Sequence, residues 1–224
     1  MKTKMVLSVS EKPSAKLEAR IIDTARRRFL EYGFVRVTMD DIASDLGISK
    51  ATLYKSVRGK EDLLRRIVRS VLGSIHFRIQ TIMGAPGLPV AEKLARLFSA
   101  LSEEFGQIRP AMALDIRKAA PDIWAEIEAF RKEHILTHFR NLLETGKAEG
   151  VFRSETDINL IIRMFLFAIQ GILNPEEIAR ADRSPSQTFA AIVKILFGGI
   201  LTDTARLAFE QSGAPLHNPR QEDL

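Results

Sequence analysis

The sequence predicts an all-α fold with two domains. Apolar residues recur at helical spacing through most of the chain, and no segment alternates apolar and polar residues over the length of a strand. Glycine and proline interrupt this periodicity at intervals, which marks the ends of separate helices. Residues 1–70 hold 16 Lys and Arg against 9 Asp and Glu, whereas the remainder hold 17 against 19. We therefore expect a basic N-terminal domain that meets a polyanion and a near-neutral C-terminal domain.

Residues 38–64 have the pattern of a helix-turn-helix followed by a longer helix. Thr38 and Asp41 have the spacing of a capping box, so a helix is expected to begin directly after Thr38. Gly47 stands where the chain needs a positive φ, and Ser49 is placed to cap a second helix. The alternative to a DNA-binding motif is a helix-glycine-helix connection of the kind that any small helical domain can contain. The apolar positions expected to pack the two helices together are Val37, Ile42, Ala43, Leu46, Ile48 and Leu53.

This stretch resembles the TetR family of bacterial transcriptional regulators. The resemblance is carried by Leu53-Tyr54-Lys55 and by Gly59-Lys60-Glu61-Asp62-Leu63, where a tyrosine ends one helix and a small-Lys-Glu-x-Leu sequence opens the next. The match extends backwards through Ala25, Phe29, Gly33, Phe34, Thr38 and Ile42. The chain departs from the family at Ser56 and Val57, where a His or Tyr and then a Phe are usual, so we expect looser packing there. The resemblance covers about the first 65 residues.

The resemblance implies an N-terminal three-helix helix-turn-helix DNA-binding domain plus a C-terminal helical ligand-binding and dimerisation domain. We expect the domains in this order: a flexible basic arm (1–13), the DNA-binding domain (14–60), the effector-binding and dimerisation domain (61–211) and a disordered tail (212–224). Helices outside the helix-turn-helix are expected over 14–32, 60–83, 89–106, 108–118, 121–149, 155–174 and 185–211. The helix over 60–83 would link the two domains mechanically.

The predicted recognition helix covers residues 50–55. In a helix-turn-helix the N-terminal residues of the second helix meet base edges in the major groove. Lys50 suits guanine and the methyl group of Thr52 suits a thymine methyl, while Ala51 lets the helix approach closely. The residues expected to contact phosphates are Thr38, Ser49, Tyr54, Lys55 and Lys60, with Arg36 reaching a phosphate or the minor groove.

Large apolar and aromatic side chains are plentiful in the second half of the chain. In the resembled family the helices of the second domain enclose an apolar ligand cavity, which implies a small apolar or amphipathic effector here. Core packing is the alternative for each residue taken singly. The residues expected to bind the ligand are Phe105, Met112, Trp124, Ile127, His134, His138 and Phe165.

His134 and His138 are four residues apart, a spacing that can hold a metal ion on one helix face. Both fall within an apolar stripe, and no carboxylate is placed to complete a ligand set, so no metal is expected. A buried, hydrogen-bonded pair and a pair of polar groups lining the effector cavity both remain open.

The segments 155–174 and 185–211 are apolar around much of their circumference. Burial within one subunit covers one side of such a helix, so the other side needs a partner. The resembled family pairs these helices in a four-helix bundle, which implies a homodimer. A two-fold dimer places its recognition helices about 34–36 Å apart, in successive major grooves.

Several classes of function lack their motifs. The chain has no cysteine, no apolar run long enough to span a membrane and no signal peptide, so a cytoplasmic protein is expected. It has no nucleophile motif and no H-E-x-x-H, and Thr145-Gly146-Lys147 lacks the rest of a phosphate-binding loop. We expect neither an enzyme nor a cofactor.

These observations favour a sequence-specific DNA-binding transcriptional regulator. The resemblance to the TetR family implies a ligand-released repressor that binds a palindromic operator as a dimer. One alternative is a nucleoid-type binder held on DNA by charge alone. The other is a helical small-molecule-binding or interaction protein with a degenerate helix-turn-helix, which the departure at Ser56-Val57 keeps open.

Overall fold

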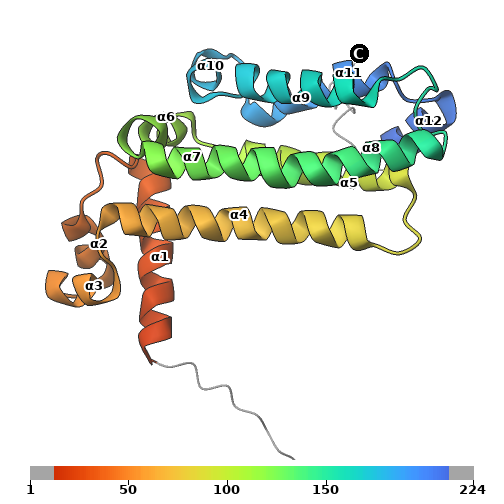
Figure 1. Cartoon of the computed structure of the whole chain (residues 1–224). Helices are drawn as coiled ribbons and strands as arrows, with labels where there is room; N and C mark the ends of the chain where they lie inside the picture. The colour runs from red at the N-terminus through yellow and green to blue at the C-terminus, as the bar shows by residue number, and fades with distance from the viewer. Residues whose placement is uncertain (1–12, 212–224) are drawn as a thin grey trace, which may run out of the picture. The chain divides into compact units, whose positions relative to one another are not determined.

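The computed structural model describes residues 13–211, apart from the side chains of Pro13, Ser14, His134 and Ile135. The tail predicted over 212–224 and nearly all of the predicted arm therefore lie outside the described residues. The chain divides into two compact units, one ending at Arg69 and the other beginning at Ser70. The described residues are helical apart from turns, loops and an isolated β-bridge, which confirms the all-α class (Figure 1).

The N-terminal unit consists of three helices and the first turns of a fourth. They are α1 (Pro13–Tyr32), α2 (Met39–Leu46), α3 (Lys50–Ser56) and α4 (Lys60–Gly84). The core of this unit is made of apolar side chains that repeat at helical spacing, because each helix buries one stripe. The fully buried members are Ile21, Ala25, Phe29, Ile42, Leu53, Leu63 and Leu64.

The C-terminal unit contains the rest of α4 and a set of shorter helices. These are α5 (Val90–Gly106), α6 (Pro110–Ala119), α7 (Pro121–Phe130), α8 (Leu136–Ala148), α9 (Ile158–Ile172), α10 (Pro175–Arg180), α11 (Pro185–Gly198) and α12 (Asp203–Gln211). Within this unit α5 packs against α8, α11 and α12, and α9 packs against α8 and α11 (Figure 1). Phe98 of α5 lies at the centre of the core. Its ring has five aromatic neighbours with centroids 4.8–6.1 Å away, namely Phe139, Phe165, Phe189, Phe197 and Phe209.

The helix predicted over 121–149 is interrupted by a π-helical turn at Arg131–Ile135, between α7 and α8. Ile123 and Phe139 are both buried, with 1% of their surface exposed. In an unbroken α-helix, sixteen residues of separation place two side chains roughly 160° apart around the axis. The π-turn takes more residues per turn, and it therefore returns both side chains to the core.

The helix predicted over 185–211 is wrong as a single element, because the chain leaves the helix between α11 and α12. Leu201 forms an antiparallel β-bridge with Phe152, and both side chains are buried. Arg153 N–H donates to the Ile200 carbonyl at 2.9 Å, and Thr202 N–H donates to the Val151 carbonyl at 3.0 Å. These bonds tie the α8–α9 loop to the α11–α12 loop and satisfy backbone groups that a continued helix would use.

Among the residues described, no helix combines the length and apolarity needed to cross a membrane.

Candidate nucleic-acid interface

The two helices of the helix-turn-helix begin at the residues that their caps predict. Thr38 N–H donates to Asp41 Oδ2 at 2.8 Å, and Asp41 N–H donates to Thr38 Oγ1 at 3.2 Å, which completes the capping box. Gly47 has φ 63° and ψ 33°, the left-handed conformation that glycine adopts without steric cost. Ser49 Oγ accepts from Thr52 N–H at 3.1 Å and caps α3. The predicted helix-turn-helix geometry is confirmed.

One face of α3 is buried and the opposite face is exposed. Leu53 is fully buried, and Val57, directly after the helix, is 2% exposed. The exposed residues of α3 are Lys50, Ala51, Tyr54 and Lys55, which share one side of the helix at spacings of one, four and five residues. The expected loosening at Val57 is therefore not seen, because this side chain packs into the core in place of an aromatic ring. A capped short helix thus presents a polar face to solvent.

Lys50 is paired with a carboxylate of the preceding helix. Its Nζ lies 2.7 Å from Asp40 Oδ1 and 3.1 Å from Oδ2, and both side chains are more than half exposed. The hydrogen bond from Lys50 to Asp40 raises the pKa of the Lys50 ammonium. The sequence did not reveal Asp40 as a partner of Lys50, because the separation along the chain of two paired residues on different helices follows no fixed rule. The base contact predicted for Lys50 stays a prediction, and it requires that Lys50 first release Asp40.

Three hydroxyl groups predicted to meet DNA already form hydrogen bonds within the protein. Thr38 Oγ1 donates to Asp41 Oδ2 at 2.7 Å while it accepts from the Asp41 backbone. Ser49 Oγ and Thr52 Oγ1 lie 2.9 Å apart, and Ser49 also caps α3. These hydroxyls fix the helix starts, so the backbone N–H groups of the first turns are better placed than the Thr38 hydroxyl to meet a phosphate.

Lys60 lies against the loop that precedes α2. Its Nζ donates to the carbonyls of Val35 at 3.0 Å and Val37 at 2.9 Å, and it lies 4.6 Å from the centroid of the Phe34 ring. The side chain therefore holds the loop between α1 and α2 in place. Its predicted phosphate contact stays a prediction, and the structure assigns the ammonium a positioning role.

Salt bridges hold α1 against α2. Arg28 Nε donates to Asp45 Oδ2 at 2.6 Å, and Arg27 Nη2 lies 3.4 Å from the same carboxylate oxygen. The hydrogen bond from Arg28 lowers the pKa of Asp45, and the same bond raises the pKa of Arg28. Arg36, in the loop between the helices, is exposed. The N-terminal unit thus fixes α2 from one side while Arg36 and the outer face of α3 stay open to solvent.

The seven residues predicted to bind a ligand do not have one environment. Phe165 is 3% exposed within the aromatic core, and Phe105 stacks on Phe189 with centroids 4.9 Å apart. These two side chains pack the core. The half-buried members of the set are Met112, Trp124, Ile127 and His138.

The predicted arrangement of the His134 and His138 side chains stays a prediction. His134 belongs to the π-turn, and its side chain lies outside the described part of the structure. The ring of His138 lies 6.2 Å from that of His76 on α4. Nearby, the Arg131 guanidinium lies 5.8 Å from the Trp124 ring centroid and pairs with Glu128 at 2.9 Å. Burial lowers the pKa of Arg131, with Glu128 opposing that shift.

Comparisons with known proteins find the same kind of DNA-binding unit in bacterial regulators. Residues 21–67, from α1 to the start of α4, match the family model for bacterial regulatory proteins of the tetR family. This match identifies the N-terminal unit as a DNA-binding unit of the tetR type. It is 25% identical over 187 residues to the uncharacterized HTH-type transcriptional regulator YvaF of Bacillus subtilis, covering 84% of this chain and 97% of that protein.

Further TetR-family relatives are similar over most of the chain. The HTH-type transcriptional repressor KstR2 of Mycolicibacterium smegmatis is 29% identical over 147 residues, which cover 64% of this chain and 71% of KstR2. The crystal structure of the transcriptional regulator FadR from Bacillus subtilis, in complex with stearoyl-CoA, has a TM-score of 0.60 at 20% identity and covers 81% of this chain and 98% of FadR. The second likeness concerns the fold. With its tetR-type N-terminal unit and these relatives, the chain is a DNA-binding transcriptional regulator.

Proposed function

We propose that the protein is a repressor that binds a palindromic operator as a homodimer and leaves it when a small ligand binds. The exposed polar face of α3, held by the Thr38 and Ser49 caps, carries this proposal. A helix so presented can enter a major groove as a rigid unit. The repressor KstR2 among the relatives supports repression as the direction of control.

Within this proposal the exposed residues of the interface have different roles. Lys50 and Thr52 meet base edges, and Ala51 allows close approach. Tyr54 and Lys55 meet the phosphate backbone, where charge and hydroxyl donors position a protein without reading sequence. Lys55 forms no ion pair with another described residue, so its charge is available to a phosphate. The other proposed contacts are Arg36, Thr38, Ser49 and Lys60.

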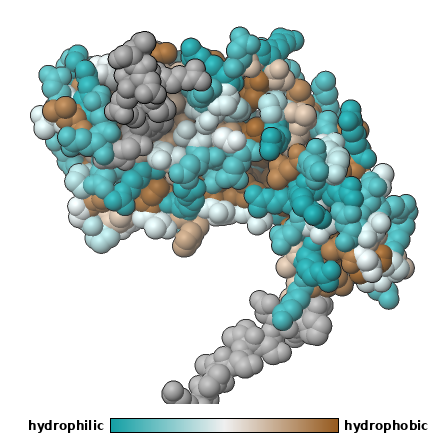
Figure 2. All heavy atoms as spheres, turned by 180° about the vertical axis from the view of Figure 1, so that it is seen from behind, coloured by the Kyte–Doolittle hydropathy of each residue, from teal (hydrophilic) through white to brown (hydrophobic). Residues whose placement is uncertain are grey.

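The dimer contact is proposed on α9 and α11. Leu160, Met164 and Phe167 recur at intervals of four and three residues on α9 and are 51%, 44% and 67% exposed, while Ile195 of α11 is 76% exposed. Apolar side chains reach the surface among mostly polar ones in Figure 2. An apolar stripe with no cover in the monomer is typical of a surface that meets a second copy.

The effector is proposed to be a small apolar or amphipathic molecule bound by the C-terminal unit. Binding releases DNA when the ligand prefers a dimer whose recognition helices no longer match the half-site spacing. The helix α4 contains residues of both units, and it therefore offers a covalent path for such coupling.

The test is selection from a random duplex library with purified protein at near-physiological salt. We expect enrichment of a palindrome with half-sites one helical turn apart, about 34–36 Å. Binding without enrichment would replace this proposal with the charge-driven binder. A folded dimer that binds no duplex would replace it with the ligand-binding alternative.

A further inference from the structure

A cleft between two helices of the C-terminal unit shares no residue with the predicted effector set. It has a volume of about 620 Å³, within the range of about 300–1,000 Å³ that holds small molecules. Its residues come from the end of α7, the π-turn, α8 and α9. They are Ala129, Lys132, Glu133, Leu136, Thr137, Arg140, Asn141, Ile162, Arg163 and Leu166.

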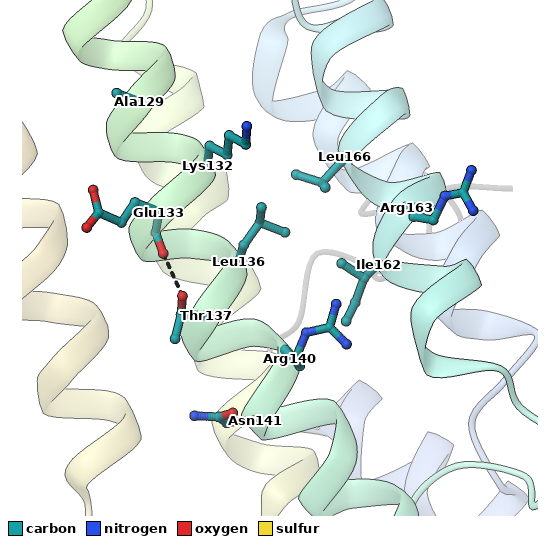
Figure 3. A pocket seen from close by; sticks show the side chains of 10 residues that line it. All are labelled: Ala129, Lys132, Glu133, Leu136, Thr137, Arg140, Asn141, Ile162, Arg163 and Leu166. Atoms are coloured by element: carbon teal, nitrogen blue, oxygen red, sulfur yellow. Dashed lines mark hydrogen bonds between the residues drawn. The ribbon is translucent and has the colours of Figure 1, made fainter.

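The space between the helices has an apolar centre and a cation at each end. Leu136, Ile162 and Leu166 point towards one another across the gap between α8 and α9 in Figure 3. Lys132 extends into the upper end of this gap, and Arg140 extends into the lower end. The carboxylate of Glu133 points away from the gap. The charged groups that extend into the cleft are therefore positive, and they lie next to the apolar side chains at its centre.

Arg140 and Lys132 differ in the hydrogen bonds and ion pairs that they already form within the protein. Arg140 Nη1 donates to Asn159 Oδ1 at 2.5 Å and lies 3.8 Å from Glu144 Oε1. Lys132, in contrast, forms no hydrogen bond or ion pair with another described residue. An anionic group entering the cleft therefore gains more from Lys132, whose ammonium has three donors and no acceptor among the described residues.

Lys132 owes its position to the π-turn. It is the second residue of Arg131–Ile135, and the turn carries one extra residue between the stripes of α7 and α8. Lys132 lies about one helical turn before Leu136, above the apolar centre of the cleft (Figure 3). Such π-turns occur frequently at functional sites, and this one borders the cleft.

We propose that this cleft binds a single-chain amphipathic anion, with its headgroup on Lys132 and its hydrocarbon tail between Leu136, Ile162 and Leu166. The inference deepens the proposed function by naming the chemistry of an effector. Ligand binding is measured without DNA, so a failure of ligand binding and a failure of DNA binding are separate results. If both hold, occupancy of the cleft lowers operator affinity.

The experiment is calorimetric titration of the full chain with decanoate below its micelle concentration. Hexanoate and octanoate serve as shorter anions, and decyltrimethylammonium serves as a cation of equal tail length. We expect decanoate to bind, affinity to fall about fourfold for each CH₂ removed, and the cationic amphiphile to bind at least tenfold more weakly. Equal binding of the anion and the cation would overturn the proposal.

Charge-reversal variants locate the headgroup. Lys132→Glu should weaken decanoate binding about tenfold or more, because a charge-assisted hydrogen bond is replaced by repulsion. Lys118→Glu on α6 is the matched control: Lys118 is exposed and outside the cleft, and its reversal should leave affinity within twofold. Equal effects of the two variants, or no effect of Lys132→Glu, would place the anion elsewhere. Lys132→Gln removes the positive charge without adding a negative one, so it should weaken binding less than Lys132→Glu.

The oligomeric state is measured on the same samples by light scattering. We expect decanoate binding per chain to be unchanged across the concentration range of dimer formation. Loss of binding as the dimer forms would mean that a second copy covers the cleft, and would overturn the proposal.

Discussion

Two glycines in this chain are needed for different physical reasons. Gly47 lies in the left-handed region, and a Cβ added there meets nothing within 4 Å. Gly146 of α8 has ordinary helical geometry, but a Cβ there lies 2.6 Å from Phe152 Cε2 and 2.9 Å from Val90 Cγ1. Both neighbours are buried and cannot move aside cheaply. A side chain at position 47 is thus disfavoured by the backbone conformation, whereas a side chain at position 146 is disfavoured by contact with neighbouring side chains.

We expect Gly47→Ala to lower the free energy of unfolding by about 1–2 kcal/mol through backbone strain. Gly146→Ala should lower it by about 1–3 kcal/mol through overpacking. Gly73→Ala on α4, where a Cβ is free of contacts within 4 Å, is the control and should raise stability by about 0.5–1 kcal/mol. Chemical denaturation of the three variants measures these changes. A harmless Gly146→Ala would show that Phe152 can repack.

Lys60 gives a second prediction, because its ammonium binds two backbone carbonyls. Lys60→Met keeps most of the side-chain stem but leaves the Val35 and Val37 carbonyls without this donor. We expect a loss of about 1–3 kcal/mol in unfolding free energy, together with weaker DNA binding.

Lys55→Met is the matched control for Lys60→Met. It should leave stability within about 0.5 kcal/mol and lower the salt dependence of DNA binding by roughly 0.9 in slope. Thermal melts and binding titrations at several salt concentrations separate the two residues. If Lys60→Met is as stable as the wild-type chain, Lys60 does not hold the loop in place and its only remaining proposed role is to contact a phosphate.

At the scale of elements, the α2 N-terminus depends on an ionised carboxylate. The Thr38 backbone N–H donates to Asp41 and lowers the pKa of this carboxyl below its ordinary 3.8. A carboxyl with a lower pKa in the folded chain stabilises the fold above its unfolded pKa, and this stabilisation disappears as pH falls through the folded value. The capping box therefore contributes fully at neutral pH and is lost in acid.

We expect Asp41→Asn to lower the melting temperature at pH 6 and to have a shrinking effect as pH falls from about 4 to 2. Calorimetry of the wild-type chain and the variant at each pH measures this difference. Asp23→Asn is the control, because Asp23 is an exposed residue of α1. A difference between Asp41→Asn and wild type that stays constant down to pH 2 would contradict the assignment.

Residues with local signals let the sequence predict the boundaries of α2 and α3. The capping pattern of Thr38 and Asp41 and the glycine at 47 act within a few residues, so their geometry follows from sequence alone. The π-turn was also encoded, since Ile123, Ile127 and Phe139 repeat at multiples of four residues, a period that an α-helix does not keep. It was missed because each helical stretch on either side fits an ordinary stripe.

Long-range partners explain what the sequence did not predict. The break after α11 depends on the bridge from Leu201 to Phe152, which lies 49 positions earlier in the chain. The same holds for the interface, where the Asp40–Lys50 pair and the carbonyl partners of Lys60 depend on how helices pack. Residue type identified the polar face of α3, but only packing shows which of its groups are already bonded.

At the scale of the whole molecule, the exposed stripe on α9 and α11 predicts the assembly state. Phe167→Glu and Ile195→Glu should each shift the chain towards monomer, because a buried unpaired charge opposes association. Phe77→Glu is the matched control, since Phe77 of α4 is 70% exposed and outside that stripe. Light scattering over a range of concentrations measures the shift.

Dimers that form equally well in Phe167→Glu, Ile195→Glu and Phe77→Glu would place the contact elsewhere. Variants at α9 that become monomeric should also lose operator affinity, because a single recognition helix reads one half-site.

The pairing of Lys50 with Asp40 has a consequence for how fast an operator is found. On an arbitrary duplex we expect the Lys50 ammonium to remain with Asp40 and the negative charge of Asp40 to repel the phosphates, so that the protein dissociates quickly. In the proposed base contact, Lys50 exchanges Asp40 for a guanine, and we expect the protein to stay longer at such a site. A short residence time on non-operator DNA leaves the protein more time to slide and hop along the duplex. We therefore expect Asp40 to speed the search along DNA and to weaken binding at non-operator sites.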